Sequence, residues 1–178
     1  MAGTEAGDRP ATLVVVTGVP GAGKTTLGSA VARALGAPLL SLDTLKERLY
    51  ASSPADLDPH ELRLAAEAEL VDELAAGAGT VVVDIWVAPQ RDTDRVVGLL
   101  RRQPRSVVEL LCRVPAEIAV RRYAERQRSG PHRRADRATL QRIREAAARM
   151  EPMPIGRCIE VDTSRPVDLD SLIDLLSL

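Results

Sequence analysis

A glycine-rich run that ends in Lys-Thr carries the strongest chemical signal of the chain. Residues 18–25 read Gly-Val-Pro-Gly-Ala-Gly-Lys-Thr and match the phosphate-binding pattern G-x-x-x-x-G-K-[ST] in full. The glycines let backbone N–H groups turn toward phosphate oxygens, and the helix that follows adds the positive end of its dipole. Lys24 can reach the β- and γ-phosphates of a nucleotide, and the Thr25 hydroxyl can bind Mg²⁺. The residues expected to bind the nucleotide are Gly18, Val19, Pro20, Gly21, Ala22, Gly23, Lys24, Thr25 and Thr26.

Two aspartates stand at the ends of predicted strands, where an open α/β sheet binds its ligands. Asp84 closes an apolar run and suits Mg²⁺, bound directly or through water, although it could instead only cap the strand end. Asp43 follows the next strand back along the chain. A carboxylate there could orient an acceptor hydroxyl and take its proton during phosphate transfer. The alternative for Asp43 is the N-cap of the helix that follows, and one side chain can serve both roles.

Lysine is scarce, because Lys24 and Lys46 are the only lysines among 24 basic residues. Lys46 lies about one turn after Asp43, where it could hold the substrate or help neutralise the γ-phosphate. Its alternative is a solvated charge on a helix. Proteins that resemble switch-type GTPases carry an Asn-Lys-x-Asp motif. The sequence Leu-Lys-Glu-Arg around Lys46 does not match this motif. Small phosphotransferases remain as the expected class.

An arginine-rich segment at residues 121–137 suits a mobile lid over the phosphates. Arg122 and Arg126 are four residues apart, so they share a helix face, and Ser-Gly-Pro at 129–131 would let the segment swing. Such arginines bind transferring phosphate and help to exclude water, although a solvated basic face is the alternative. Tyr50, Trp86 and Arg133 are assigned to the acceptor pocket. The arginines of the lid are Arg121, Arg122, Arg126, Arg128, Arg133, Arg134 and Arg137.

Apolar strand-like runs alternate with helical patterns along the whole chain. This alternation predicts an α/β three-layer sandwich with a five-stranded, mostly parallel sheet. Together with the motif at residues 18–25, it predicts a P-loop NTPase fold that is nucleoside-kinase-like and has a mobile lid. Expected strands cover residues 12–17, 39–42, 80–85, 106–112 and 158–161. Expected helices cover residues 25–35, 44–50, 61–76, 90–102, 115–128, 137–150 and 169–176, with a loop at 52–59.

The composition is that of a globular domain of ordinary size. The 178 residues are 45% apolar and 28% charged with a net charge of −1, which gives no reason to expect bulk binding to nucleic acid or membrane. Cys112 and Cys158 lie in strand-like runs and are expected to be free thiols in a reducing, cytoplasmic compartment. We expect one domain over residues 1–178 with a loose tail at 1–11, and neither a secretory signal nor a membrane span.

Taken in order, these motifs resemble the small P-loop kinases related to the polynucleotide 5′-hydroxyl kinases. Zeta-type toxins, chloramphenicol phosphotransferase and gluconate kinase are similar in outline. The resemblance implies that Asp43 is the general base and that Lys46 contacts phosphate, where the polynucleotide enzymes carry Arg. It also implies that Arg122 or Arg126 contacts the nucleotide or the transferring phosphate, and that Thr163, in the segment 162–165, lies near the adenine.

The sequence therefore predicts a kinase that uses ATP and Mg²⁺ to phosphorylate a hydroxyl of a small molecule, such as an antibiotic or a nucleoside. The acceptor is expected to bind along residues 44–77. One alternative is a polynucleotide 5′-hydroxyl kinase, but that activity needs a basic groove with stacking aromatics and this region is not basic. The other alternative is a nucleotide-binding regulatory module that consumes no ATP. The sequence gives no sign of the oligomeric state.

Overall fold

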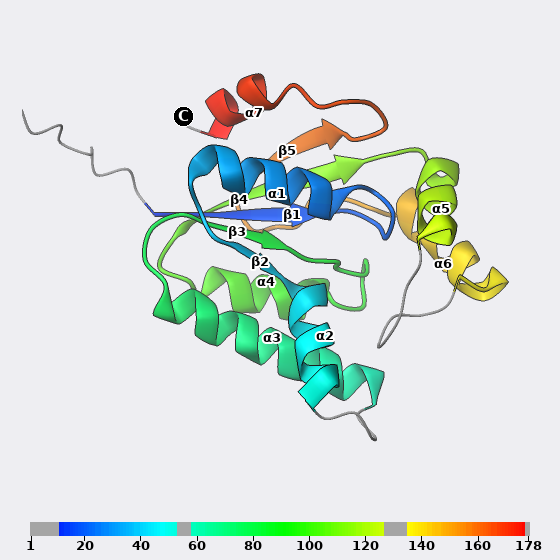
Figure 1. Ribbon diagram of the computed structural model, residues 1–178, viewed down its shortest axis with the longest axis horizontal. Coiled ribbons are helices and arrows are strands. Elements are labelled where there is room, and N and C mark those ends of the chain that lie inside the picture. Colours follow the sequence, from blue (N-terminus) through cyan, green and yellow to red (C-terminus); the bar gives the residue numbers. More distant parts are fainter. Residues whose placement is uncertain (1–10, 53–57, 127–134, 177–178) are drawn as a thin grey trace, which may run out of the picture.

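A twisted parallel sheet forms the centre of the protein (Figure 1). The computed structural model describes residues 11–52, 58–126 and 135–176. The strands lie in the order β2-β3-β1-β4-β5, and every neighbouring pair is parallel. This arrangement confirms the predicted α/β sandwich with five strands. The strands are β1 (Thr12–Thr17), β2 (Leu39–Ser41), β3 (Val81–Asp84), β4 (Ser106–Arg113) and β5 (Arg157–Asp162).

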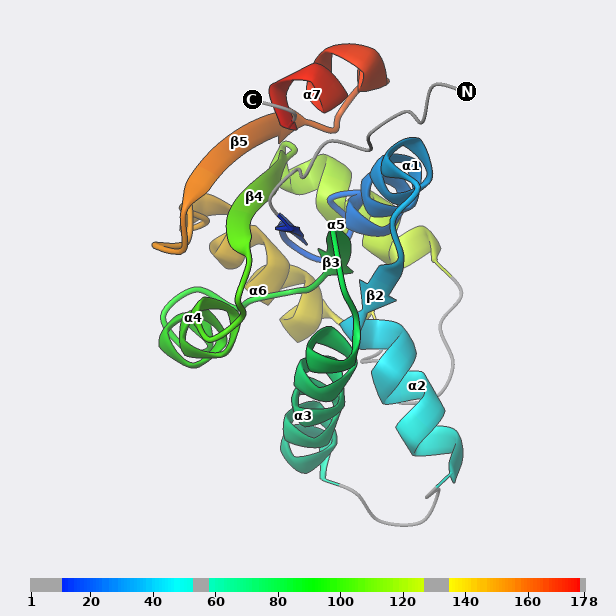
Figure 2. The ribbon, with the colours of Figure 1, turned by 90° about the vertical axis from the view of Figure 1, so that its left-hand side faces the viewer.

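Helices cover both faces of the sheet, as Figure 2 shows. They are α1 (Lys24–Leu35), α2 (Leu42–Ser52), α3 (Pro59–Ala76), α4 (Thr93–Arg101), α5 (Ala116–Glu125), α6 (Arg137–Ala148) and α7 (Leu169–Leu176). Side chains of β1 alternate between the two faces. Val14 and Val16 pack with α1, α5, α6 and α7, whereas Leu13 and Val15 pack with α2, α3 and α4. The central strand is therefore buried on both sides.

Two helix starts differ from the sequence prediction. The chain enters α2 at Leu42, and Leu42 and Leu45 are both buried, so packing of the first turn draws the helix back to the end of β2. At α3 the Asp58 side chain accepts the N–H of His60 at 2.7 Å, which starts the helix at Pro59 instead of residue 61. Residues 53–57 of the predicted loop lie outside the described residues.

The ends of two later helices also differ. α4 covers Thr93–Arg101 and not 90–102, because Gln90 has a positive φ of 65° and Asp92 stands at the N-cap position. α5 ends at Glu125, and the predicted break at 129–131 lies outside the described residues. Both cysteines are free, as expected. In the described part of the chain, none of the helices has the length and apolar character needed to cross a bilayer.

Candidate active site

The phosphate-binding loop joins β1 to α1 at the carboxyl edge of the sheet (Figure 1). Its glycines adopt conformations that other residues rarely adopt, with φ of 139° at Gly18 and 88° at both Gly21 and Gly23. A Cβ on Gly21 would lie 2.1 Å from the carbonyl oxygen of Ala119, so the loop packs directly on α5. Gly23 caps α1 without a side-chain hydrogen bond. The first N–H groups of α1 are therefore open to an anion.

Lys24 and Thr25 sit at the start of α1 and reach in different directions. Lys24 Nζ donates a hydrogen bond to the carbonyl oxygen of Val19 at 3.2 Å, so the ammonium lies over the loop. Thr25 Oγ1 donates to Asp84 Oδ2 at 2.7 Å. A hydroxyl and a carboxylate are the hard oxygen ligands that Mg²⁺ prefers, and Mg²⁺ commonly uses only one or two protein ligands beside phosphate and water. The pair therefore fits a Mg²⁺ site.

The sheet register explains why Asp84 is close to the loop. Asp84 ends β3 opposite Val16 of β1, and it is only 5% exposed. Burial raises the pKa of its carboxyl, and the charge of Lys24 and the hydrogen bond from Thr25 oppose that rise. A bound cation would favour the ionised form further. In the described part of the chain, His, Cys, Asp and Glu form no cluster of three or more that could hold a metal. A Mg²⁺ ion at Asp84 would therefore also need other ligands, such as the Thr25 hydroxyl, phosphate oxygens and water.

Asp43 and Lys46 form an ion pair on the first turns of α2. Lys46 Nζ donates to Asp43 Oδ1 at 3.2 Å, and the Asp43 side chain is half exposed. Because β2 pairs with β3, with Ser41 opposite Asp84, α2 starts beside Asp84 at the carboxyl end of β3. Asp43 lies one residue inside the helix, so the alternative of an N-cap does not hold. Lys46 is 18% exposed, which also argues against a freely solvated charge.

A single cavity of about 1030 Å³ connects these groups. Its walls come from the phosphate-binding loop, from α2 and α3, from the segment after β3, and from α5 and α6. Predicted site residues that the cavity brings together are Pro20, Gly21, Gly23, Lys24, Thr25, Thr26, Asp43, Lys46, Tyr50, Trp86, Arg122 and Arg126. Asp84 reaches the same place through its hydrogen bond to Thr25. The phosphate-binding loop and the residues predicted to bind the acceptor thus face one space.

The lid arginines are only partly within the described structure. Arg122 lines the cavity, and its Nη1 donates to the carbonyl oxygen of Thr163 at 3.0 Å. Arg126 follows the last residue of α5 and lines the same cavity. Arg137 is exposed at the start of α6. Arg128, Arg133 and Arg134 lie outside the described residues, so the assignment of Arg133 to the acceptor stays a prediction.

Thr163, expected near the adenine, braces the phosphate-binding loop. Its hydroxyl donates to the carbonyl oxygen of Ala22 at 2.6 Å and lies 3.0 Å from that of Arg113. The residue is 9% exposed and is not one of the described residues that line the cavity. The hydroxyl is thus committed to protein carbonyls, and a contact between Thr163 and the nucleotide stays a prediction.

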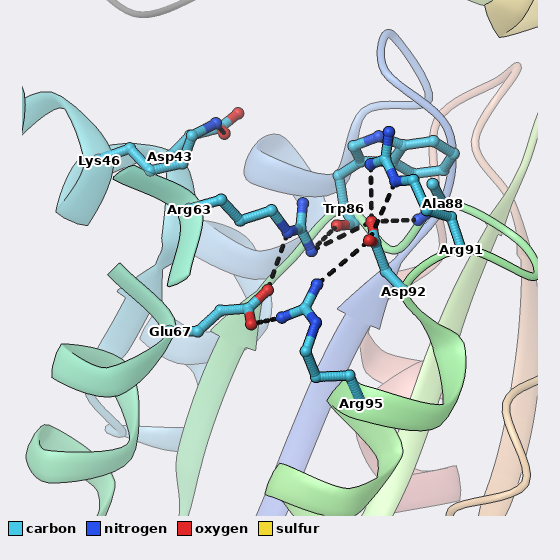
Figure 3. Close-up of polar contacts among 9 residues, drawn as sticks. All are labelled: Asp43, Lys46, Arg63, Glu67, Trp86, Ala88, Arg91, Asp92 and Arg95. Carbon is cyan, nitrogen blue, oxygen red and sulfur yellow. Dashed lines mark hydrogen bonds and ion pairs between the residues drawn. The ribbon is translucent and has the colours of Figure 1, made fainter. Parts of the chain in front are cut away.

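Sequence reasoning missed a group of charged residues on α3, α4 and the segment after β3, at the wall of the cavity (Figure 3). Arg63 of α3 donates from Nε to Glu67 Oε1 at 2.8 Å and from Nη2 to the carbonyl oxygen of Trp86 at 2.9 Å. The other oxygen of Glu67 pairs with Arg95 of α4. The i, i+4 spacing of Arg63 and Glu67 was visible in the sequence, but their partners after β3 were not. We call the set Arg63, Glu67, Arg91, Asp92 and Arg95 the Arg63 cluster.

Asp92 is the second acid of the Arg63 cluster. It accepts hydrogen bonds from Arg91 Nε and Nη2 at 3.0 and 2.7 Å and from Arg95 Nη2 at 3.1 Å. Burial favours a higher pKa for Asp92, but its hydrogen bonds from Arg91 and the charge of Arg63 bring the pKa below the usual value. Asp92 also accepts the N–H of Ala88 at 3.3 Å, so it holds the segment that follows Trp86 in place.

The α6 wall of the cavity was also missed. Arg142 and Glu145 of α6 line the cavity, and so does Arg149, the residue that directly follows the helix. The helix is started by Asp136, which accepts the N–H of Thr139 at 2.7 Å. The helical pattern was predicted from the sequence, but the face that would meet the cavity was not, because α6 packs beside α5 only in the folded chain.

The comparisons with known proteins agree with the α/β fold. A family model described as an AAA domain matches residues 13–152, which is 140 of the 178 residues. The protein belongs to this AAA domain family. The match begins in β1 and ends after α6, so the AAA domain includes the phosphate-binding loop, Asp43, Asp84 and the Arg63 cluster. β5 and Thr163 lie beyond the matched residues.

Two curated proteins match parts of the chain. A shikimate kinase of Thermobifida fusca is 43% identical over 75 residues, 40% of this chain and 44% of that protein. A protein of Methanocaldococcus jannaschii, provisionally assigned as an adenylate kinase, is 26% identical over 100 residues, 55% of this chain and 56% of that protein. The chain thus spans about half the length of the curated relatives it matches.

Two solved structures share the fold over nearly the whole chain. A provisionally assigned kinase of Chloroflexus aurantiacus superposes with a TM-score of 0.78 at 23% identity, covering 96% of this chain and 100% of that one. A sugar kinase of Janibacter sp. HTCC2649 superposes with a TM-score of 0.61 at 25% identity, covering 94% and 92%. At 23% identity, the likeness to the Chloroflexus aurantiacus structure is a likeness of fold alone.

Proposed function

We propose that the protein is a kinase that transfers the γ-phosphate of ATP to a hydroxyl group of a small molecule, with Asp43 as general base. One observation carries the proposal: the phosphate-binding loop and the Asp43–Lys46 pair face the same cavity. A regulatory nucleotide-binding module would not need a carboxylate beside that loop. The kinase names of the two curated relatives support the same class of reaction.

On the nucleotide side, the open N–H groups at the start of α1 bind phosphate oxygens. Lys24 can exchange its hydrogen bond to Val19 for one to the β- or γ-phosphate. Thr25 and Asp84 would hold Mg²⁺. When bound, the ion neutralises charge that develops on the phosphate oxygens. Arg122 and Arg126 line the cavity and can neutralise the remaining negative charge.

On the acceptor side, Asp43 accepts the proton of the hydroxyl as the hydroxyl oxygen bonds to the γ-phosphorus of ATP. The bond from that phosphorus to the β-phosphate oxygen breaks, and ADP leaves. Its carboxylate is half exposed toward the cavity, so a hydroxyl can reach it. Lys46 holds Asp43 in place through the ion pair and can contact the transferring phosphate. Tyr50 and Trp86 line the cavity near these groups and supply apolar contact for the body of the acceptor. Phosphate transfer itself requires only the hydroxyl of the acceptor and no acidic or basic group on it.

The test is a screen with γ-³²P-labelled ATP and Mg²⁺ against sugars, sugar acids, nucleosides, hydroxyl-bearing antibiotics and 5′-hydroxyl oligonucleotides. We expect label to move to a small molecule, and the Lys24→Ala variant to lose ATP affinity and transfer together. ATP that binds tightly but transfers to no acceptor would support a regulatory module instead. Transfer to oligonucleotides with a steep salt dependence would favour the polynucleotide kinase alternative. The narrower resemblance to polynucleotide kinases and zeta-type toxins, and the cytoplasmic location, stay predictions.

A further inference from the structure

The Arg63 cluster carries one positive charge more than its acids neutralise. It holds three guanidinium groups, on Arg63, Arg91 and Arg95, and two carboxylates, on Glu67 and Asp92. Glu67 is shared between Arg63 and Arg95, and Asp92 between Arg91 and Arg95, with Arg63 3.6 Å away. Because both acids serve several arginines, neither of them belongs to Arg63 alone.

Arg63 is the buried cation of this set. Its side chain is 10% exposed, against 30% for Arg95 and 65% for Arg91. Burial lowers the pKa of Arg63, and the charges of Asp92 and Asp43 oppose this effect, but an arginine side chain stays protonated in proteins. A buried charge that is incompletely paired is costly, so an additional anion beside Arg63 would be stabilising.

The geometry leaves one edge of the Arg63 guanidinium toward the cavity. Nε donates to Glu67 and Nη2 donates to Trp86, so two of the three nitrogens are committed. In the described structure, Nη1 takes part in none of the hydrogen bonds of Arg63, and Figure 3 draws it pointing away from Glu67 and Asp92. Arg63, Asp43 and Trp86 all line the same cavity. The two fixed nitrogens hold the free one in a defined direction.

We propose that the acceptor of the kinase is an anionic hydroxyl compound whose carboxylate or phosphate group binds Arg63, while its hydroxyl lies at Asp43. The inference rests on the proposed function, and it names the chemical class of the acceptor for that same site. Glu67 and the Trp86 carbonyl orient the guanidinium, so they act as positioning groups. A neutral nucleoside or a neutral antibiotic would bring no negative charge to offset the surplus positive charge of the Arg63 cluster.

The test compares acids with neutral counterparts: shikimate with its methyl ester, gluconate with sorbitol, and glycerol 3-phosphate with glycerol. Phosphate transfer from ATP is measured for each compound, and binding is measured by calorimetry with the protein saturated with Mg²⁺ and a non-hydrolysable ATP analogue. The first two pairs report on carboxylates and the third on a phosphate. The variants are Arg63→Gln and Arg63→Lys. Arg144→Gln is the matched control, because Arg144 pairs with Glu117 on the surface and does not line the cavity.

We expect at least one acid to bind and its neutral counterpart to bind far more weakly. Arg63→Gln should weaken binding of the acid about 10- to 100-fold, the range for a lost hydrogen bond to a charged group. Arg63→Lys keeps the charge and so should keep the fold while still weakening the acid. ATP affinity and the Arg144→Gln control should match the wild type.

Two results would overturn the inference while leaving the proposed function intact: a neutral acceptor that is phosphorylated as well as its acid, or an acid whose KM does not change in either Arg63 variant. Absence of Arg63-dependent binding of every acid in the calorimeter also overturns it. Conversely, Arg63-dependent binding of an acid with no phosphate transfer to any acceptor would count against the proposed function and leave the anion site standing.

Discussion

Thr25 Oγ1 donates a hydrogen bond to Asp84 Oδ2 at 2.7 Å, which ties the first turn of α1 to the end of β3. The two residues are 59 positions apart in the sequence, but they meet because β1, which leads into the loop and α1, lies beside β3 in the sheet. This pair places a hydroxyl and a carboxylate where Mg²⁺ could bind next to the phosphate-binding loop. It also connects this loop to β3, the strand that leads to the proposed acceptor side of the cavity.

Replacing Asp84 separates metal binding from nucleotide binding. Asp84→Asn keeps an oxygen that can accept from Thr25 but removes the negative charge. We expect ATP to bind this variant equally well with and without Mg²⁺, whereas Mg²⁺ strengthens binding to the wild type. Calorimetric titrations with Mg²⁺ and with EDTA measure both values. A variant that keeps the full Mg²⁺ effect would remove Asp84 from the metal site.

The base assignment predicts a loss of turnover without a loss of nucleotide affinity. Asp43→Asn cannot accept the proton, so the rate of phosphate transfer should fall about 10²- to 10⁴-fold. ATP affinity should be unchanged, because none of the nucleotide contacts proposed above uses Asp43. The comparison variant is Glu47→Gln, which changes an exposed carboxylate on the same helix that does not line the cavity. Equal turnover in the two variants would mean that another group is the base.

Two substitutions of Lys46 test whether the proposed base, Asp43, needs a positive charge beside it. Lys46→Ala removes the partner of Asp43 and a cation that can contact phosphate, so kcat should fall about 10- to 100-fold, the range for a charged hydrogen bond. Lys46→Arg keeps the cation and should recover part of this loss, since both side chains can carry the same contact. Steady-state kinetics at saturating ATP measure the effect. No difference between the Ala and Arg variants would limit Lys46 to packing.

Gly21 is the strictest position of the phosphate-binding loop. Gly21→Ala must fit a Cβ 2.1 Å from the Ala119 carbonyl oxygen while holding a φ of 88°, so the loop must move. We expect ATP affinity to drop and the melting temperature to fall. Gly98→Ala is the control, because a Cβ there has no atom within 4 Å and helix α4 gains up to about 1 kcal/mol from alanine. Unchanged ATP binding by Gly21→Ala would contradict the loop geometry.

Glu109 gives a prediction on pH and stability. This carboxyl is fully buried, and burial raises its pKa although Thr17 and the N–H of Met153 donate to it at 2.6 and 2.7 Å. The folded state therefore holds the Glu109 proton more tightly than the unfolded state. Its contribution to the free energy of unfolding is greatest below the unfolded pKa, falls as the pH rises to the folded pKa, and is constant above it.

Glu109→Gln should abolish that slope, which denaturant unfolding at several pH values would measure. The amide can accept from Met153 and donate to Thr17, so the variant should be as stable as the wild type at pH 7, or more stable. Glu109→Ala leaves both partners unsatisfied and should cost about 1–3 kcal/mol or more. If Glu109→Gln keeps the wild-type pH profile, the slope comes from another group.

The part of the site that sequence reasoning found is the part encoded locally. The phosphate-binding loop is a run of adjacent residues, and Asp43 and Asp84 follow apolar strands, so their place at the edge of the sheet follows from the fold. Strand positions agreed within one or two residues, whereas helix starts depended on capping by Asp58 and on burial of Leu42.

The Arg63 cluster was hidden for a physical reason. Arg63 meets Asp92 and Trp86 only because α3 packs under the segment after β3, and no spacing rule links residues so far apart. Arginine is also common throughout this chain, so the type of residue carried little information. The same holds for Thr163, whose role depends on the contact between β5 and the loop.

The hydrogen bond from Thr163 to Ala22 joins the phosphate-binding loop to a residue 141 positions later in the chain. Because a ribosome makes the chain from its N-terminus, the loop emerges well before the residue that braces it. ATP affinity should therefore rise once residue 163 can reach the loop. A nascent chain stalled before residue 163 has left the exit tunnel should bind ATP more weakly than one stalled well after it.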